Sequence, residues 1–265
     1  MKHYALIGKP LGHSWSQRLF EETVPADVAD YRLCELPSLD GLQRWVVDND
    51  ISGFNVTAPY KEAILPYLDA MSPEAKEIGA VNCVKVVDGK LIGYNTDAPA
   101  FRHTLKDTLT HSHINTLTHS YILGTGGAAR AVAYALGQMG IDYTFVSRHP
   151  ERIKVKGKRL KVISYAELTD FTSQLSPFTL LINATPVGTW PNVDASPLPP
   201  NFQFSIFNFQ LVYDLIYNPS PTLLMRQAAE RGAKVVDGLA MLRLQAKLSR
   251  DIFFADNTEY QPIAK

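Results

Sequence analysis

The stretch YILGTGGAARAVAYALGQMG, residues 121–140, decides the fold of this chain. It reads as a short apolar strand, a turn with Gly124, Gly126 and Ala129 spaced as G-x-G-x-x-A, and an alanine-rich helix that stops at Gly140. Gly124 permits a tight turn, Gly126 lets the backbone approach a pyrophosphate, and Ala129 allows close packing of helix on strand. The free N–H groups at the helix N-terminus would hold the pyrophosphate. The stretch therefore predicts a dinucleotide site, against the simpler interpretation of a plain strand-to-helix turn.

The next strand, residues 141–148, indicates which dinucleotide is bound. It ends in the run Ser147, Arg148, His149, Pro150, Glu151 and Arg152. NAD sites usually carry an acidic residue here for the ribose 2′-OH, whereas guanidinium groups suit the 2′-phosphate of NADP. Glu151 is the nearby acid, and we expect it to pair with an arginine. The run favours NADP over NAD, the alternative being that both arginines are solvated surface residues.

Composition is that of an ordinary globular protein. The 265 residues are 46% hydrophobic and 20% charged, with a net charge of zero. No global attraction to nucleic acid or to an anionic membrane follows from this charge, and no apolar run is long enough to span a bilayer. Cys34 and Cys83 are too few for a disulfide framework and lack metal-site spacing, so we expect reduced thiols in a cytoplasmic protein.

Strands and helices alternate along the chain, which predicts an α/β fold of two domains. The boundaries predicted are a first domain over 1–100 and 238–265, and a Rossmann domain over 101–237. We expect strands at 2–8, 31–36, 51–56, 143–147, 178–183 and 212–217, a hairpin over 80–95 turned at Asp88-Gly89, and helices at 14–24, 39–49, 96–109 and 238–256. Residues 111–120 are expected to form the junction, and residues 190–204 a surface loop. The 238–256 helix is placed back on the first domain.

Polar residues of the first domain gather at the ends of predicted strands, where α/β folds bind ligands. Ser14 and Ser16 could form a small anion cradle at a helix start, although from these residues alone simple capping by Ser14 is the favoured interpretation. Lys61 and Asp97 could form a catalytic ammonium–carboxylate pair. From spacing alone they could equally be solvated surface charges, and nothing local places them in contact.

Eight segments, in order across nearly the whole chain, resemble the shikimate dehydrogenase family. They are GKPLGHSWS (8–16), GFNVTAPYK (53–61), IGAVN (78–82), GYNTD (93–97), GTGGAARA (124–131), INATPVG (182–188), DLIYNP (214–219) and DGLAMLRLQ (237–245). The resemblance implies NADP-dependent interconversion of shikimate and 3-dehydroshikimate, a step toward the aromatic amino acids. It also implies that the first domain binds substrate and carries the catalytic residues, and that a cleft separates it from the Rossmann domain. A small-molecule substrate and a monomer or homodimer are implied as well.

The resemblance assigns roles residue by residue. The catalytic pair would be Lys61 and Asp97. Substrate would be bound by Ser14, Ser16, Thr57, Asn82, Tyr217 and Gln245. The cofactor would be bound by Gly124, Gly126, Gly127, Ala128, Arg130, Ser147, Arg148, His149, Arg152, Thr185, Leu215 and Gly238. No metal is expected, because the only histidine cluster (His111, His113 and His119) lies in a polar loop that favours solvated side chains.

The chain departs from the family pattern at Gln17, Phe20, Cys83 and Ala100, which puts the pocket rim and the hinge region in question. Two other functions stay open. A relative that prefers quinate or NAD is disfavoured by the two serines and the two arginines. A non-catalytic nucleotide sensor on the same fold is disfavoured by Lys61 and Asp97, since a sensor needs no proton-transfer pair.

Overall fold

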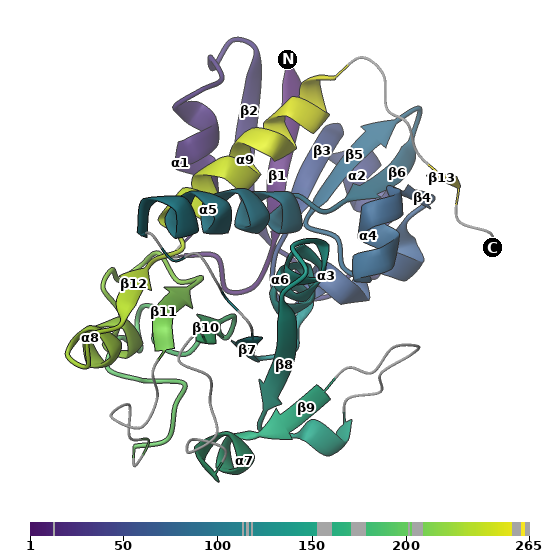
Figure 1. Cartoon of the computed structure of the whole chain (residues 1–265). Coiled ribbons are helices and arrows are strands. Elements are labelled where there is room, and N and C mark those ends of the chain that lie inside the picture. Colours follow the sequence, from purple (N-terminus) through teal and green to yellow (C-terminus); the bar gives the residue numbers. More distant parts are fainter. Residues whose placement is uncertain are drawn as a thin grey trace. The chain divides into compact units, whose positions relative to one another are not determined.

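The structure is a computed structural model of the whole chain, and it describes every residue except 13, 113, 115, 116, 118, 153–160, 171–178, 201, 203–208, 256–260 and 263–265. The chain divides into two compact units, Met1–Ala100 with Arg243–Lys265, and Phe101–Leu242 (Figure 1). The first break falls where the 1–100 boundary was expected. The second falls five residues after Gly238, inside a helix. None of the helices among the described residues is long and apolar enough to cross a membrane.

The first unit contains a mixed seven-stranded sheet in the order β13-β4-β6-β5-β3-β1-β2. Its strands are β1 (Lys2–Gly8), β2 (Ala29–Glu35), β3 (Ile51–Val56), β4 (Ala70–Met71), β5 (Cys83–Val87), β6 (Lys90–Tyr94) and β13 (Gln261–Pro262). Its helices are α1 (Ser16–Glu21), α2 (Leu42–Asp48), α3 (Tyr60–Ala63), η1 (Leu65–Tyr67) and α4 (Pro73–Ile78), joined by most of α9 (Leu239–Phe254). The expected hairpin turned at Asp88-Gly89 is the antiparallel pair β5–β6.

Side chains alternate across β1, and both sets are buried. Ala5 and Ile7 enter a core cluster with α2 and α3 residues on one face, whereas Tyr4 and Leu6 enter another with Phe253 of α9. Tyr4 stacks on Phe253 with ring centroids 4.7 Å apart. Burial on both faces is what a strand inside a helix-covered sheet requires, and the contact with Phe253 places α9 against this strand.

The second unit contains a parallel six-stranded sheet in the order β12-β11-β10-β7-β8-β9. Its strands are β7 (His119–Leu123), β8 (Asp142–Ser147), β9 (Lys161–Ser164), β10 (Thr179–Asn183), β11 (Phe209–Asp214) and β12 (Lys234–Val236). Its helices are α6 (Gly127–Gln138), η2 (Pro150–Arg152), α7 (Tyr165–Asp170) and α8 (Leu223–Ala229), with most of α5 (Asp97–Ser112). Counted from β7, the order is 3-2-1-4-5-6, the doubly wound Rossmann arrangement, which binds dinucleotides where the order reverses between β7 and β10.

Several element bounds differ from those expected from sequence. Helix α1 spans Ser16–Glu21 rather than 14–24, and β11 ends at Asp214 rather than 217. The junction expected at 111–120 is partly regular structure, because α5 runs to Ser112 and β7 begins at His119. In the 190–204 segment, Leu198 and Phe202 are buried in the core of the second unit, so this loop does not lie wholly at the surface.

Candidate functional site

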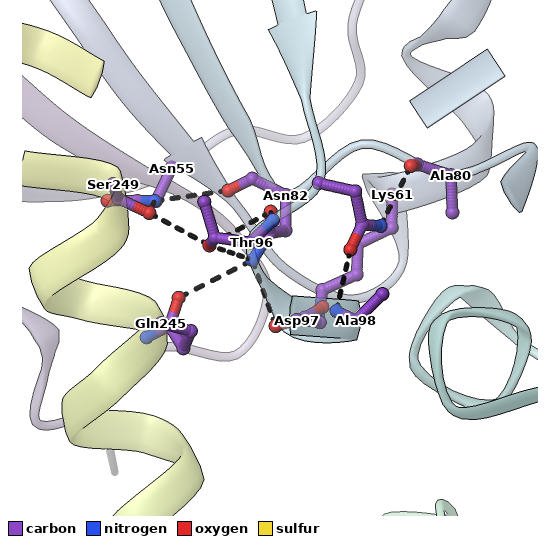
Figure 2. Close-up of polar contacts among 10 residues, drawn as sticks. Asn55, Lys61, Ala80, Asn82, Thr96, Asp97, Ala98, Gln245 and Ser249 are labelled. Atoms are coloured by element: carbon purple, nitrogen blue, oxygen red, sulfur yellow. Dashed lines mark hydrogen bonds and ion pairs between the residues drawn. The ribbon is translucent and has the colours of Figure 1, made fainter. Parts of the chain in front are cut away.

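Lys61 and Asp97 form an ion pair within the first unit. Lys61 follows β3 on the short helix α3, and Asp97 is the first residue of α5, three residues after β6 ends at Tyr94. The Lys61 Nζ lies 2.6 Å from the Asp97 Oδ2, and the side chains are 18% and 7% exposed (Figure 2). Two charges so poorly solvated stabilise each other, and the start of a helix favours a carboxylate. Their spacing in the sequence did not show whether Lys61 and Asp97 are in contact, and the structure places them in contact.

Asn82 holds this pair on its other side. Its Nδ2 donates to the Asp97 Oδ1 and to the Thr96 Oγ1, both at 2.9 Å, and approaches the Gln245 Oε1 at 3.4 Å (Figure 2). Its Oδ1 accepts from the Thr96 backbone N–H at 2.7 Å. Because one amide nitrogen has two hydrogens for three acceptors, the Gln245 contact is the weakest, and it is the one a ligand could replace most easily.

A second layer of polar side chains supports Asn82, and sequence reasoning left it out of the site. Asn55 donates from Nδ2 to the Asn82 backbone oxygen at 3.1 Å and to the Ser249 Oγ at 2.9 Å. The Tyr31 hydroxyl donates to the Asn55 Oδ1 at 2.8 Å, and Ser249 also contacts Thr96. The spacing of Ser249, four residues after Gln245 on one helix, was a signal that could have found it.

Ser14 and Ser16 lie together at the start of α1. The Ser14 Oγ donates to the Ser16 Oγ at 3.2 Å and accepts from the Ser16 backbone N–H at 3.3 Å. Trp15, not Ser14, stands at the N-cap, and its side chain makes no capping bond, but the Ser14 Oγ still accepts the N–H of the first helical residue. Thr57, half-buried, directly follows β3 and donates its backbone N–H to the oxygen of Ile7, near the end of β1.

The glycine-rich turn of the second unit has the shape a pyrophosphate needs. Gly124 has φ +95°, which a residue with a side chain rarely adopts, and a Cβ there would lie 3.0 Å from the Thr185 Cγ2. Gly126 is exposed, and a Cβ there would meet nothing within 4 Å, so the turn leaves room beside its backbone. The first N–H groups of α6, from Gly127 and Ala128, have no partner inside the helix. Ala129 is fully buried, as helix–strand packing requires.

The residues proposed for the 2′-phosphate follow β8. Arg148 and His149 are exposed, and the Ser147 Oγ accepts from the His149 backbone N–H at 3.1 Å. Glu151, which we expected to pair with an arginine, lies 3.4 Å from the His149 Nδ1. Arg130 is exposed on the first turn of α6, and the Arg152 side chain lies outside the described residues.

Thr185 and Leu215 are held by a buried network around Asn183 and Asp214 that sequence reasoning missed. Asp214 is fully buried and accepts from the Thr222 Oγ1 at 2.7 Å, the Asn183 Nδ2 at 2.9 Å and the Ile216 N–H at 3.1 Å. Burial raises the pKa of this carboxyl to about 6, against the lowering effect of those hydrogen bonds.

Asn183 also holds the loop that follows β10. Its Oδ1 accepts from the Thr185 N–H at 3.0 Å and from the Thr185 Oγ1 at 2.7 Å. Gly238 must be glycine for a different reason: a Cβ there would lie 2.0 Å from the Leu215 backbone oxygen. Tyr217 is half-buried in the second unit, and its proposed contact with substrate stays a prediction.

Among the described residues, no group of three or more His, Cys, Asp or Glu side chains could hold a metal ion. His111 contacts the Asp107 backbone oxygen and His119 contacts the Thr144 Oγ1, while His113 lies outside the described residues. Cys34 and Cys83 are free thiols, and burial raises the pKa of Cys83 to about 12.

A Rossmann unit with a nucleotide turn and a mixed α/β unit with a shielded Lys–Asp pair define the class of two-domain nicotinamide-type oxidoreductases. The family model described as "Shikimate dehydrogenase substrate binding domain" matches residues 6–84. The NADP(+) shikimate dehydrogenase of Carboxydothermus hydrogenoformans is 36% identical over 261 residues, covering 92% of this chain and 88% of that protein. The chain belongs to the shikimate dehydrogenase family.

Solved structures are similar across both units. The shikimate 5-dehydrogenase of Thermus thermophilus, in complex with NADP(H) and shikimate, is 34% identical with a TM-score of 0.79, over 96% of this chain and 94% of that chain. A quinate dehydrogenase of Corynebacterium glutamicum in complex with NAD is 26% identical with a TM-score of 0.79, over 96% and 93%.

Proposed function

We propose that the chain catalyses the reversible, NADP-dependent reduction of 3-dehydroshikimate to shikimate. The observation that carries this proposal is the 2.6 Å contact of Lys61 with Asp97 in the unit whose segment matches the family's substrate-binding domain. The dehydrogenases of C. hydrogenoformans and T. thermophilus support the choice of substrate and cofactor.

The residues of the second unit fit a phosphorylated dinucleotide. The open backbone at Gly126 and the unpaired N–H groups of α6 suit the pyrophosphate, and Arg148 suits the 2′-phosphate. Thr185, Leu215 and Gly238 would lie at the nicotinamide end. When bound, NADPH supplies the hydride for the reduction.

Lys61, positioned by Asp97, would transfer the proton that accompanies the hydride. As the substrate carbonyl becomes an alcohol its oxygen must gain a proton, and the Lys61 ammonium can donate to that oxygen and stabilise its developing charge. Asp97 would hold the ammonium in place and accept a hydrogen bond from the product hydroxyl. The pair is then ready for the reverse direction, in which the same oxygen loses its proton.

The remaining substrate contacts would fix orientation. Ser14 and Ser16 would bind the substrate carboxylate, and the ring hydroxyls would be held by Thr57, Asn82, Tyr217 and Gln245. Asn82 contacts Asp97 directly, so a hydroxyl bound by Asn82 would lie beside the catalytic carboxylate. This arrangement favours a polyhydroxylated ring acid over a simple alcohol.

The test is the change in absorbance at 340 nm with shikimate and with quinate, each with NADP and with NAD. We expect the highest kcat/KM for shikimate with NADP. A preference for quinate or for NAD would redefine the substrate or the cofactor. Retained NADP binding without any absorbance change would show a nucleotide sensor instead. Localisation in the cytoplasm, a monomeric or homodimeric state, and the division into substrate and cofactor domains are part of this proposal.

A further inference from the structure

A groove in the first unit is lined by residues of α1 and α9, which lie near each other in Figure 1. The rings of Phe20, Tyr31 and Phe253 line it. Ser16 and Gln245, two of the residues proposed to bind substrate, also line it, whereas Lys61 and Asp97 do not.

Three cationic side chains line the same groove. Arg243, Lys247 and Arg250 are spaced i, i+4 and i+7, so they form one stripe along α9. Lys247 and Arg250 share one carboxylate, that of Asp251, at 2.6 and 3.3 Å. Asp251 is not among the groove residues, and no ion pair or hydrogen bond joins the Arg243 guanidinium to any described side chain. The groove thus has a surplus of positive charge.

We propose that this groove binds a small polyanion, a molecule that carries two or more negative charges on carboxylate or phosphate groups, and that this ligand excludes the substrate. Exposed cations each contribute little to binding, so a ligand that contacts two or three of them at once is favoured over a monoanion. Because Ser16 belongs both to the groove and to the proposed carboxylate cradle, a groove ligand and the substrate carboxylate would compete. This last step rests on the proposed function, and the binding itself does not.

The test is calorimetric titration of the full chain with citrate, with inorganic phosphate and with acetate, at constant ionic strength. We expect citrate or phosphate to bind at millimolar concentration, and acetate at least about tenfold more weakly. The citrate and phosphate titrations also distinguish a polycarboxylate ligand from a phosphate ligand.

The double variant Lys247→Gln/Arg250→Gln should weaken this binding about tenfold or more. The matched control is Arg18→Gln/Arg44→Gln, which removes the same charge from exposed arginines outside the groove, each paired with a carboxylate on its own helix or at its end. Equal weakening in both variants, or no heat with either polyanion, would overturn the proposal. If the first variant fails to fold, Arg243→Gln makes the same comparison against Arg18→Gln.

Competition is then measured in the dehydrogenase assay. We expect citrate or phosphate, whichever binds, to raise the KM for shikimate and to leave the KM for NADP unchanged. Inhibition that shikimate cannot relieve would overturn competition while leaving the groove site intact. An inactive chain that still binds the polyanion would contradict the proposed function and not the groove site.

Discussion

Lys61 and Asp97 are charged side chains that lie largely out of water, and each depends on the other. Taking two charges out of solvent is costly, and the cost is offset only when their geometry is close and the remaining oxygen is hydrogen-bonded. Both conditions hold here, since Asn82 donates to the second Asp97 oxygen. Removal of the Lys61 ammonium would leave the largely buried Asp97 carboxylate with the Asn82 amide as its hydrogen-bond donor.

Lys61→Ala should therefore lower kcat by on the order of 10²–10⁴ with only a modest change in substrate binding, because the proton donor is lost and the hydroxyl contacts remain. Steady-state kinetics with shikimate and NADP would measure this. Lys76→Ala, at an exposed lysine of α4, is the control and should behave as the parent. Near-normal turnover in Lys61→Ala would remove the lysine from the mechanism.

Arg148 is the residue whose charge should distinguish the two cofactors. Arg148→Gln should raise the KM for NADP by roughly 10- to 100-fold, because a charge-assisted bond to a phosphate is worth about 1.5–3 kcal/mol. The KM for NAD, which lacks the 2′-phosphate, should stay within about twofold. Arg44→Gln, on an exposed arginine of the first unit, controls for net charge. Parallel loss with both cofactors would place the arginine elsewhere in the site.

At the scale of elements, a buried carboxylate joins the ends of β10 and β11. Asp214 accepts three hydrogen bonds and is still raised in pKa to about 6, because burial outweighs them. The folded second unit holds this proton up to a pH of about 6, whereas the unfolded chain releases it near 3.8. Acidification through that window therefore favours the folded state, and the ionised carboxylate costs stability at neutral pH.

Asp214→Asn should abolish that dependence. Between pH 4 and pH 7 the free energy of unfolding of the parent, relative to the variant, should fall by about 3 kcal/mol, the equivalent of roughly two pKa units. Denaturant unfolding followed at several pH values measures the difference. Asp194→Asn, in the loop after β10, supplies a comparison that should leave the dependence in place. A constant difference between parent and Asp214→Asn across this range would show that the carboxyl titrates normally.

Sequence patterns predicted some of the elements and contacts and missed others, and each miss has a physical reason. The glycine turn, β1 and the Asp88-Gly89 hairpin follow from local chemistry, and each is present. Strands β9 and β12 were missed because they are four and three residues long, too short for a periodic signal. The Asn183–Asp214 and Asn55–Ser249 contacts were missed because they join residues 31 and 194 positions apart, and only the folded sheets bring them together.

For the whole molecule, the chain divides into two units of different architecture, and the first is built from both ends of the sequence. Residues 243–265 complete a unit that begins at Met1, and Ser249 and Phe253 supply contacts inside it. A ligand that binds only the folded form of one unit should stabilise that unit first, by about 2.7 kcal/mol at a concentration roughly 100 times its Kd.

Hydrogen exchange read by mass spectrometry would test this division. NADP alone should slow exchange in peptides spanning Gly124–Arg130 and Ser147–His149, because the amides proposed to hold phosphate groups lie there. Shikimate alone should slow exchange around Asn55–Lys61, Asn82 and Asn95–Asp97. NAD at the same concentration is the control. It should protect Gly124–Arg130 more than Ser147–His149, because the 2′-phosphate that NAD lacks would bind at the second of these segments. If NADP instead protected only peptides from the sheet of the first unit, the nucleotide would have been assigned to the wrong unit. The roles proposed for both units would then be wrong.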